Sequence, residues 1–439
     1  MKKLICVVLS IAMVFGLSAC SVTDLTDLCK TTYNNLIKTI NEEKIKEDFG
    51  SNSIKLGVFE PQSGQLSGDA ADEILGIELA NKVFPTVLDT PVELVYEDNH
   101  SDTDYAIEAA ENLVKAGCNI VLGSYSNTLT VAALDTFEDA KVVCFCPSCS
   151  NPLITTTTNH FFRVVAVDSF QGNAAAKYII EHLAKAVHGG VIEENASSVT
   201  DQDYRDYEPM KVAVLKKAGD ERATVLIERF QAKYQEIFGE DTYVKVVEYS
   251  GSAKDLDMTI YLDRLKDSGA EVIFFPSTAD EGNTVLFEAY SRGYYFTWVG
   301  DSDWAGLVEA SSNQGLNVTS HLDGVTYVAA FDKAAAATDM TKVFLDAAQK
   351  YYHISEPSER MALGFDAYVL ALETIRTAGG YNNSENLQYA ASRLYDIKCA
   401  TGSITFRSGI GDPVKDVVIE KYVKGKVQAD YTAGPVWKY

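Results

Sequence analysis

The sequence predicts an α/β protein built from two lobes, each containing a doubly wound parallel sheet. Short apolar runs rich in Val and Ile alternate with amphipathic helical segments, the pattern of parallel strands covered by helices on both faces. This rhythm occurs twice, with a restart after His160. The chain has 439 residues, more than a single hydrophobic core normally holds, so two lobes are expected.

The N-terminus has the features of a secretory signal, which we assign to residues 1–19. Lys2 and Lys3 precede an apolar run over 4–15, and small residues lead to Cys20. The run is too short to cross a bilayer of roughly 30 Å hydrocarbon thickness. Leu-Ser-Ala-Cys resembles the bacterial lipobox, which predicts a lipidated Cys20 and a chain held on a membrane by its acyl groups. The alternative is an ordinary cleaved signal followed by an incidental cysteine.

Residues 20–53 are expected to comprise the lipidated cysteine and a stalk. The segment is polar and charged, and its few leucines and isoleucines have only weak helical spacing.

The first α/β series begins at Ile54. Its apolar runs and helical periodicities predict these elements: strand 54–59, helix 71–83, strand 92–96, helix 104–116, strand 120–123, helix 129–137 and strand 142–146.

The second series follows the same pattern: helix 172–183, strand 211–215, helix 223–238, strand 244–249, helix 259–267, strand 272–275 and helix 283–291. No segment after the signal approaches eighteen consecutive apolar residues, so the mature chain is not expected to cross a membrane.

The charge argues against nucleic acid as a partner. Removal of residues 1–19 deletes two lysines and no acid, which changes the formal net charge from −24 to −26. Such a surface repels phosphates.

The cysteines left after the signal and Cys20 are expected to pack in the core or to form disulfides. Cys144, Cys146 and Cys149 are closely spaced, but a thiolate zinc site needs four ligands, and neither a His nor a fourth Cys lies nearby. Pairing among these three and Cys118 is left open, and neither a metal nor a cofactor is expected.

The loops after the strands are the expected ligand site, because ligands of open parallel sheets bind at the carboxyl ends of strands. Three of these loops, 124–128, 147–152 and 276–280, are rich in small hydroxyl side chains, and 300–304 adds carboxylates and an aromatic ring. Ser126 or Asn127 can cap a helix beginning near Thr128 and leave backbone N–H groups for an anion. Capping without a ligand is the alternative interpretation of this loop.

Several motifs, in order along the chain, resemble the type I periplasmic binding proteins, specifically the leucine/isoleucine/valine-binding branch of ABC-transporter receptors. The resemblance begins near Ile54 and extends to the C-terminus. It rests on these segments: 54–64 with Gly76, 96–99 with Asp102, 116–124, 171–172, 401–406 and 409–412.

The resemblance implies which residues hold the ligand. In the first lobe, hydroxyls and backbone N–H groups at Ser126, Asn127, Ser148 and Ser150, next to Tyr125, would hold an α-carboxylate. In the second lobe, the position of the acid that meets an ammonium falls on Ser302, flanked by Asp301 and Asp303, and two aromatic positions fall on Thr278 and Asp220. Either the acid has shifted by one residue or the ligand lacks a standard α-ammonium. Trp304 either forms the missing aromatic wall or packs beneath the loop.

The same resemblance implies a three-stranded hinge with crossovers near Val165, Ala330 and Lys415. One lobe would contain 54–165 and 331–414, and the other 166–330 and 415–439. The expected function is a monomeric, lipid-anchored solute receptor on the extracytoplasmic face of a bacterial membrane. It would close on a small polar, amino acid-like ligand and deliver it to an ABC permease.

Two other functions are alternatives for a chain with these features. A receptor that feeds a signalling partner instead of a permease has the same domain. An enzyme on this framework would need a catalytic motif, but residues 123–127 lack the closing glycine of a Gly-x-Ser-x-Gly elbow and the six histidines form no spaced cluster. No enzymatic activity is therefore expected.

Overall fold

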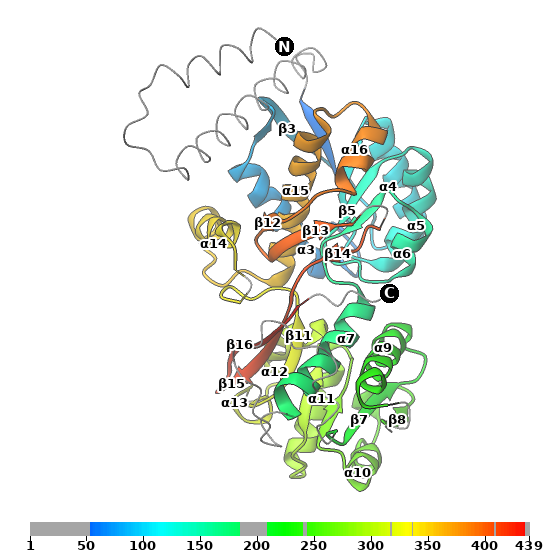
Figure 1. The fold of residues 1–439 in the computed structure, drawn as a ribbon, viewed down its shortest axis with the longest axis vertical. Helices are drawn as coiled ribbons and strands as arrows, with labels where there is room; N and C mark the ends of the chain where they lie inside the picture. Colours follow the sequence, from blue (N-terminus) through cyan, green and yellow to red (C-terminus); the bar gives the residue numbers. More distant parts are fainter. Residues whose placement is uncertain are drawn as a thin grey trace, which may run out of the picture.

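The computed structural model describes residues 53–184, 209–239, 244–316, 318–335, 337–407 and 410–434. The signal, Cys20 and the stalk up to residue 52 lie outside these residues and remain predictions. The described elements form two lobes stacked along the long axis of the molecule (Figure 1). None of the described helices is both long and apolar enough to cross a membrane.

The first lobe is built on a six-stranded sheet of order β2-β3-β1-β4-β5-β6. All neighbours are parallel except β2 and β3. The strands are β1 (Ile54–Glu60), β2 (Thr86–Val87), β3 (Thr90–Asp98), β4 (Ile120–Gly123), β5 (Val143–Cys146) and β6 (Phe161–Arg163).

Helices cover both faces of this sheet, as the alternation predicted. Leu56 and Leu122 point to a core shared with α3 (Ser67–Val83), α14 (Asp339–Tyr352), α15 (Glu359–Ala378) and α16 (Ser384–Ala391). Phe59 and Val121 point to the opposite core, shared with α4 (Thr103–Lys115), α5 (Asn127–Asp139) and α6 (Leu153–Thr157). Successive strand residues thus bury opposite faces.

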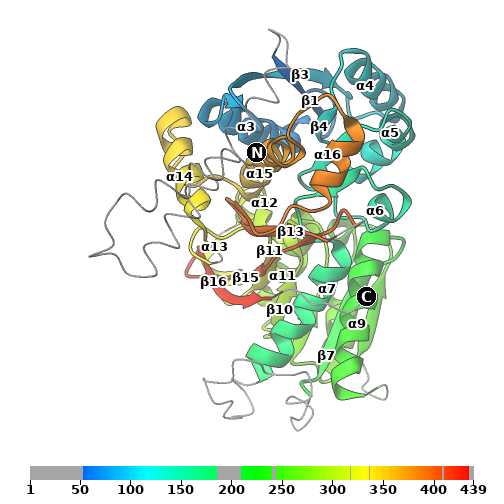
Figure 2. The same cartoon turned by 45° about the horizontal axis from the view of Figure 1, so that its top comes forward.

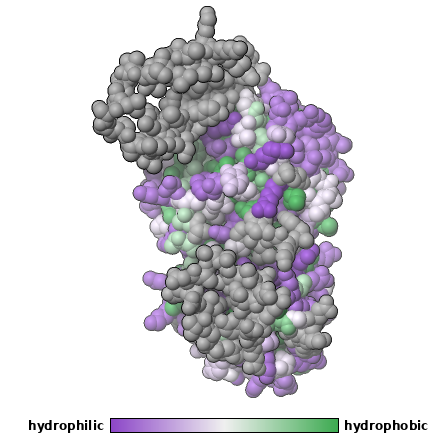
Figure 3. Space-filling model, viewed as in Figure 1, coloured by the Kyte–Doolittle hydropathy of each residue, from purple (hydrophilic) through white to green (hydrophobic). Residues whose placement is uncertain are grey.

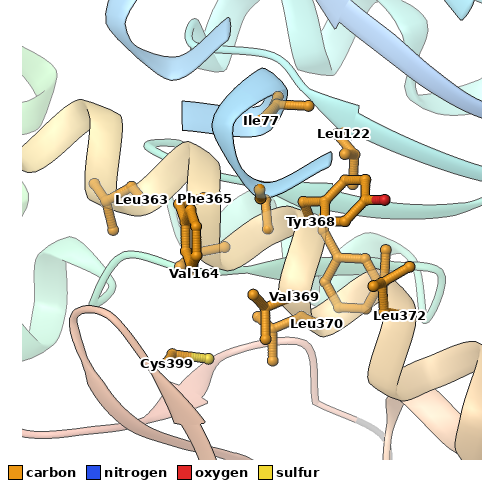
Figure 4. Close-up of a cluster of buried hydrophobic side chains, with 14 of the residues drawn as sticks. Ile77, Leu122, Val164, Leu363, Phe365, Tyr368, Val369, Leu370, Leu372 and Cys399 are labelled. Atoms are coloured by element: carbon orange, nitrogen blue, oxygen red, sulfur yellow. The ribbon is translucent and has the colours of Figure 1, made fainter. Parts of the chain in front are cut away.

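Helix α15 runs through the middle of the first core and is buried along most of its length (Figure 4). It crosses α3 at two glycines. A Cβ on Gly76 would lie 2.0 Å from the Met361 carbonyl oxygen, and one on Gly364 would lie 2.1 Å from that of Glu73. Only glycine permits this close approach, which fixes the middle of α3 beside the N-terminal turns of α15.

The second lobe is built on a seven-stranded sheet of order β16-β15-β11-β10-β9-β7-β8. Its strands are β7 (Val212–Lys217), β8 (Lys245–Tyr249), β9 (Val272–Phe274), β10 (Thr297–Gly300), β11 (Thr326–Ala329), β15 (Val417–Val423) and β16 (Lys426–Ala433). One face packs on α7 (Asp168–Lys177), the π-helix η1 (Tyr178–Leu183) and α9 (Glu221–Phe238). The other packs mainly on α10 (Thr259–Asp267) and α11 (Ala279–Ser291), with the short helices η3 (Ala253–Asp255), η4 (Ser302–Gly306), α12 (Leu307–Asn313) and α13 (Val318–His321) nearby.

The predicted α/β lobes with mostly parallel sheets are confirmed, and antiparallel pairs at one edge make both sheets mixed. Strands β15 and β16 are antiparallel, as are β2 and β3. In each pair two residues with positive φ, Lys424-Gly425 and Leu88-Asp89, form the turn. A two-residue turn of this kind joins only antiparallel strands.

The predicted helix over 172–183 also differs, because it begins at Asp168 and changes to a π-helix at Tyr178.

The chain passes between the sheets in three places. Consecutive strands belong to different sheets at three points: between β6 and β7, between β11 and β12 (Ile397–Cys399), and between β14 (Pro413–Val414) and β15. Strands β12, β13 (Gly402–Phe406) and β14 form a small antiparallel sheet near the junction of the lobes (Figure 2). The lobe boundaries implied by the crossovers near Val165, Ala330 and Lys415 remain a prediction.

Candidate functional site between the lobes

The hydroxyl-rich loops of the first lobe lie side by side because β4 and β5 are parallel neighbours. Ser126 is the N-cap of α5, accepting from the Leu129 N–H at 3.5 Å. The Asn127 side chain accepts the Asn151 N–H of the next loop at 3.1 Å. Ser126 therefore caps α5 and Asn127 braces the neighbouring loop.

Two buried carboxyls use the donors that were expected to meet a ligand carboxylate. The Tyr125 N–H donates to Glu60 at 2.7 Å, and the Ser148 hydroxyl donates to Glu73. Glu60 ends β1 and Glu73 lies on α3, and both are fully buried. The anion at this helix end is thus the protein's own carboxylate.

Glu60 and Glu73 form an acid pair. Burial, and then the neighbouring Glu73, raises the pKa of Glu60 well above its usual value. Burial raises the pKa of Glu73 to about 7, although the Ser148 hydroxyl lowers it. Glu60 Oε1 and Glu73 Oε2 lack another hydrogen-bond donor within the described part of the chain. Two such carboxyls side by side are stabilised when one keeps its proton.

Arg360 adds a cation on the same side. It lies in the first turn of α15, its Nη2 donates to the Tyr125 hydroxyl at 3.2 Å, and its guanidinium carbon lies 5.0 Å from the Tyr125 ring centroid. Its Nη1 pairs with Asp69 at 2.8 Å, and the two side chains are 38% and 50% exposed. Arg360 therefore remains accessible to solvent.

The second lobe has a denser charge cluster around Arg222, in the first turn of α9. Its Nη1 contacts Asp301 at 2.6 Å and Asp303 at 3.1 Å. Its Nε contacts Asp168 at 3.4 Å, and its Nη2 donates to Ser302 at 3.2 Å. Asp168 and Asp301 are 2% and 1% exposed, so the guanidinium neutralises acids that have little access to water.

Three carboxyls compete for this guanidinium. Burial raises the pKa of Asp301 to about 8, although Arg222 lowers it, and Asp303 and Asp168 add to the rise. Burial opposes the charge of Arg222, but the three carboxylates outweigh it and raise the Arg222 pKa well above its usual value. The cluster is therefore held together by one guanidinium.

Asp220 and Thr278 cap helices. Asp220 accepts from the Ala223 N–H of α9 at 2.8 Å, and Thr278 from the Glu281 N–H of α11 at 3.4 Å. Thr278 is exposed in the loop between β9 and α11.

Trp304 packs beneath the loop, so the interpretation as an exposed aromatic wall is wrong. It is fully buried, its indole N–H donates to Ser277 at 3.0 Å, and its ring lies edge-on to Phe275 at 6.0 Å. Trp304, four residues past the end of β10, thus buries its apolar ring and satisfies its N–H in the core.

The two sets of loops meet across the junction of the lobes. The Ser150 carbonyl accepts the Asp168 N–H at 3.1 Å, and Asp168 in turn contacts Arg222. Asp303 lies close enough to raise the pKa values of Tyr125 and Arg360, after burial and nearer charges. We call this junction, from Tyr125, Ser150 and Arg360 to Arg222 and Asp303, the interlobe site.

Buried groups also join the crossovers. Lys415 is a buried residue, only 2% exposed. Its Nζ donates to the Val164 carbonyl at 3.3 Å and to the Thr401 hydroxyl at 2.6 Å. Glu359 accepts the Ala330 N–H at 2.8 Å. Burial lowers the pKa of Lys415, against the Asp366 carboxylate, which raises it. Lys415 thus links the first and third passages between the sheets, and Glu359 links the start of the second passage to α15.

The cysteines within the described residues are buried free thiols. They are Cys118, Cys144, Cys146, Cys149 and Cys399. The disulfide pairing that the sequence left open does not form among these five residues. Cys149 donates to the Ser124 carbonyl at 2.9 Å and so braces the loop before α5.

Two cavities lie elsewhere on the second lobe. One of about 710 Å³ lies beside the starts of β7 and β8, and one of about 450 Å³ lies beside α11 and β10. The first cavity lies at the sheet edge opposite the carboxyl ends of its strands. Neither cavity is lined by a residue that defines the interlobe site, so both are separate from it.

Sequence reasoning missed the charged residues of the interlobe site: Glu60, Glu73, Asp168, Arg222 and Arg360. One signal was available for the two arginines. Each lies in the first turn of a helix, where the helix dipole disfavours a cation unless acids are nearby. The acids themselves come from distant segments, and only the fold brings them together.

Comparison with known proteins agrees with this architecture. A leucine-, isoleucine-, valine-, threonine- and alanine-binding protein of Pseudomonas aeruginosa is 26% identical over 252 residues, covering 55% of this chain and 58% of that protein. The chain thus spans little more than half the length of this curated relative. The crystal structure of a leucine-binding protein from Thermotoga maritima superposes with a TM-score of 0.70 at 23% identity, covering 87% of this chain and 99% of that one.

A branched-chain amino acid transporter substrate-binding protein from Streptococcus pneumoniae, in complex with isoleucine, gives a TM-score of 0.69 at 23% identity, covering 88% and 100%. The sequence model described as periplasmic binding protein matches residues 53–426. That family consists of binding proteins, which confirms the expectation that the chain is not an enzyme. The chain belongs to the periplasmic binding protein family, as its two mixed α/β lobes and their junction indicate.

Proposed function

We propose that the chain is the solute receptor of an ABC importer, which captures a small polar ligand by closure of its two lobes. The observation that carries the proposal is the meeting of loops from two sheets at the interlobe site, in a chain of this family. Closure would remove water from the ligand, so each of its charges must meet a fixed partner. The related proteins named above bind leucine, isoleucine and similar amino acids, which makes an amino acid or a related small molecule the first ligand class to test.

The crossovers support the closing motion. Three chain passages, joined by Lys415 and Glu359, allow rotation of one lobe against the other with few residues changing conformation. The acidic surface, largely hydrophilic where Figure 3 shows described residues, favours a water-exposed lobe pair.

Calorimetry of the purified protein against amino acids, short peptides and small organic acids tests the proposal, combined with small-angle scattering with and without the ligand. We expect one class to bind with micromolar or tighter affinity and to reduce the radius of gyration. Mass spectrometry of any co-purified molecule would identify the class directly. Silence across the whole panel, with no co-purified molecule, would overturn the receptor function.

The location of the chain is a separate part of the proposal. We propose an extracytoplasmic protein held on the membrane through lipid on Cys20, next to its permease. Cys20→Ala should move the protein from the membrane fraction to the soluble fraction. Membrane retention of the variant would contradict the lipid anchor.

A further inference from the structure

The place in the second lobe where a ligand ammonium was expected already holds a cation. Arg222 contacts Asp301, Asp303 and Asp168 through Nη1 and Nε, and Ser302 through Nη2. Guanidinium has five N–H donors, and these four contacts use nearly all of them. The shift of the acid by one residue, left open by the sequence, therefore does not create a free ammonium site, because Arg222 fills it.

The first-lobe donors that were expected to bind a ligand carboxylate are also occupied. The Ser148 hydroxyl and the Tyr125 N–H donate to Glu73 and Glu60, so they are not free for a ligand carboxylate. Two contacts of Arg360, with Asp69 and the Tyr125 hydroxyl, leave it donors to spare among the described residues. Its side chain is 38% exposed, so this guanidinium can reach an anion at the interlobe site.

We propose that the ligand is a carboxylic acid without an amino group, whose carboxylate binds Arg360 while Arg222 replaces the missing ammonium. The inference rests on the proposed receptor function and narrows its ligand class. An amino acid would bring a second cation to acids that Arg222 already neutralises. It would have to displace Arg222 or leave its own ammonium desolvated without a partner, and both cost affinity.

The test uses pairs of ligands that differ only in the amino group. Leucine is compared with 4-methylpentanoate, and phenylalanine with 3-phenylpropanoate, by calorimetry on the wild-type protein. We expect the amine-free member of at least one pair to bind at least tenfold more tightly. This comparison needs no variant, so it does not depend on how well a variant folds.

Two variants then assign the roles. R222M should open the acid cluster and shift the preference toward the amino member by tenfold or more, whereas R360M should weaken the amine-free acid by tenfold or more. R229M, at an exposed position of the same helix α9, is the matched control and should leave both affinities unchanged.

The outcomes separate this inference from the receptor function. Tighter wild-type binding of the amino members, or of another amino acid or a short peptide from the broader panel, would overturn the ligand class and leave the receptor function intact. No binding by any member of the broader panel would overturn both.

Discussion

The two lobes carry an arginine at matching places, and they use it differently. Arg222 and Arg360 each follow a capping residue and a glutamate in the first turn of a helix at the interlobe site. Arg222 is packed among acids of its own lobe, two of them almost completely buried. Arg360 pairs with the half-exposed Asp69, and within the described residues it forms no ion pair with the buried Glu60 or Glu73.

The difference shows two solutions to the same problem of burying carboxyls. The second lobe compensates Asp168 and Asp301 with a fixed positive charge, whereas the first lobe compensates Glu60 and Glu73 with a proton. Arg222 lowers the pKa of Asp301, although burial still holds that pKa at about 8, and the proton kept by the Glu60–Glu73 pair makes the first-lobe cluster sensitive to pH near 7. The changes in the free energy of unfolding caused by variants in the two clusters should therefore differ in size and in their dependence on pH.

The largest effect is expected for Arg222→Met. It leaves two buried carboxyls without their cation, which should lower the free energy of unfolding by about 3–5 kcal/mol at pH 7. Urea unfolding followed by circular dichroism measures it. Arg360→Met removes a guanidinium whose ion-pair partner, Asp69, is half exposed, so the loss of stability should stay at about 1 kcal/mol or less. Equal losses in the two variants would contradict the contrast between the lobes.

The next largest effect is expected for Glu73→Gln. The unfolded chain releases this proton near pH 4.5 and the folded protein near pH 7, so rising pH destabilises the folded wild type over that interval. Glutamine removes this loss, and the variant should gain about 3 kcal/mol over the wild type between pH 4 and pH 8. Denaturant unfolding at the two pH values measures the change.

The control for this pair is Glu78→Gln, which alters a half-buried carboxyl farther along the same helix α3. The pH-dependent gain of E73Q should exceed that of E78Q. If E73Q instead loses stability relative to the wild type as the pH rises from 4 to 8, Glu73 is ionised in the folded protein and the shared-proton interpretation fails.

The smallest effect is expected for Asp303→Asn. Asp303 is 41% exposed and contacts Arg222 at a longer distance than Asp301 does, so water can replace its contact. We expect a loss of less than about 1 kcal/mol, as for other exposed ion pairs. Thermal unfolding measured beside Asp301→Asn, which should cost more, would show whether burial rather than charge alone sets the size of the effect.

The sequence by itself determined the framework of this protein. Alternating apolar strands and amphipathic helices predicted two doubly wound lobes, and the expected strands and helices lie close to the observed ones. Local chemistry also located helix caps such as Ser126, because a cap depends only on residues two or three positions away. The antiparallel edges were missed, although Lys424-Gly425 is a local turn signal.

Only the tertiary structure decided the chemistry of the interlobe site. Arg222 meets Asp168 and Asp301 from segments 54 and 79 positions away, and Glu73 meets Ser148 at a separation of 75. No periodicity or spacing encodes such pairs, because they depend on how sheets and loops pack. The burial that shifts the Glu73 and Asp301 pKa values is likewise a property of the folded lobes, since it depends on which distant side chains exclude water.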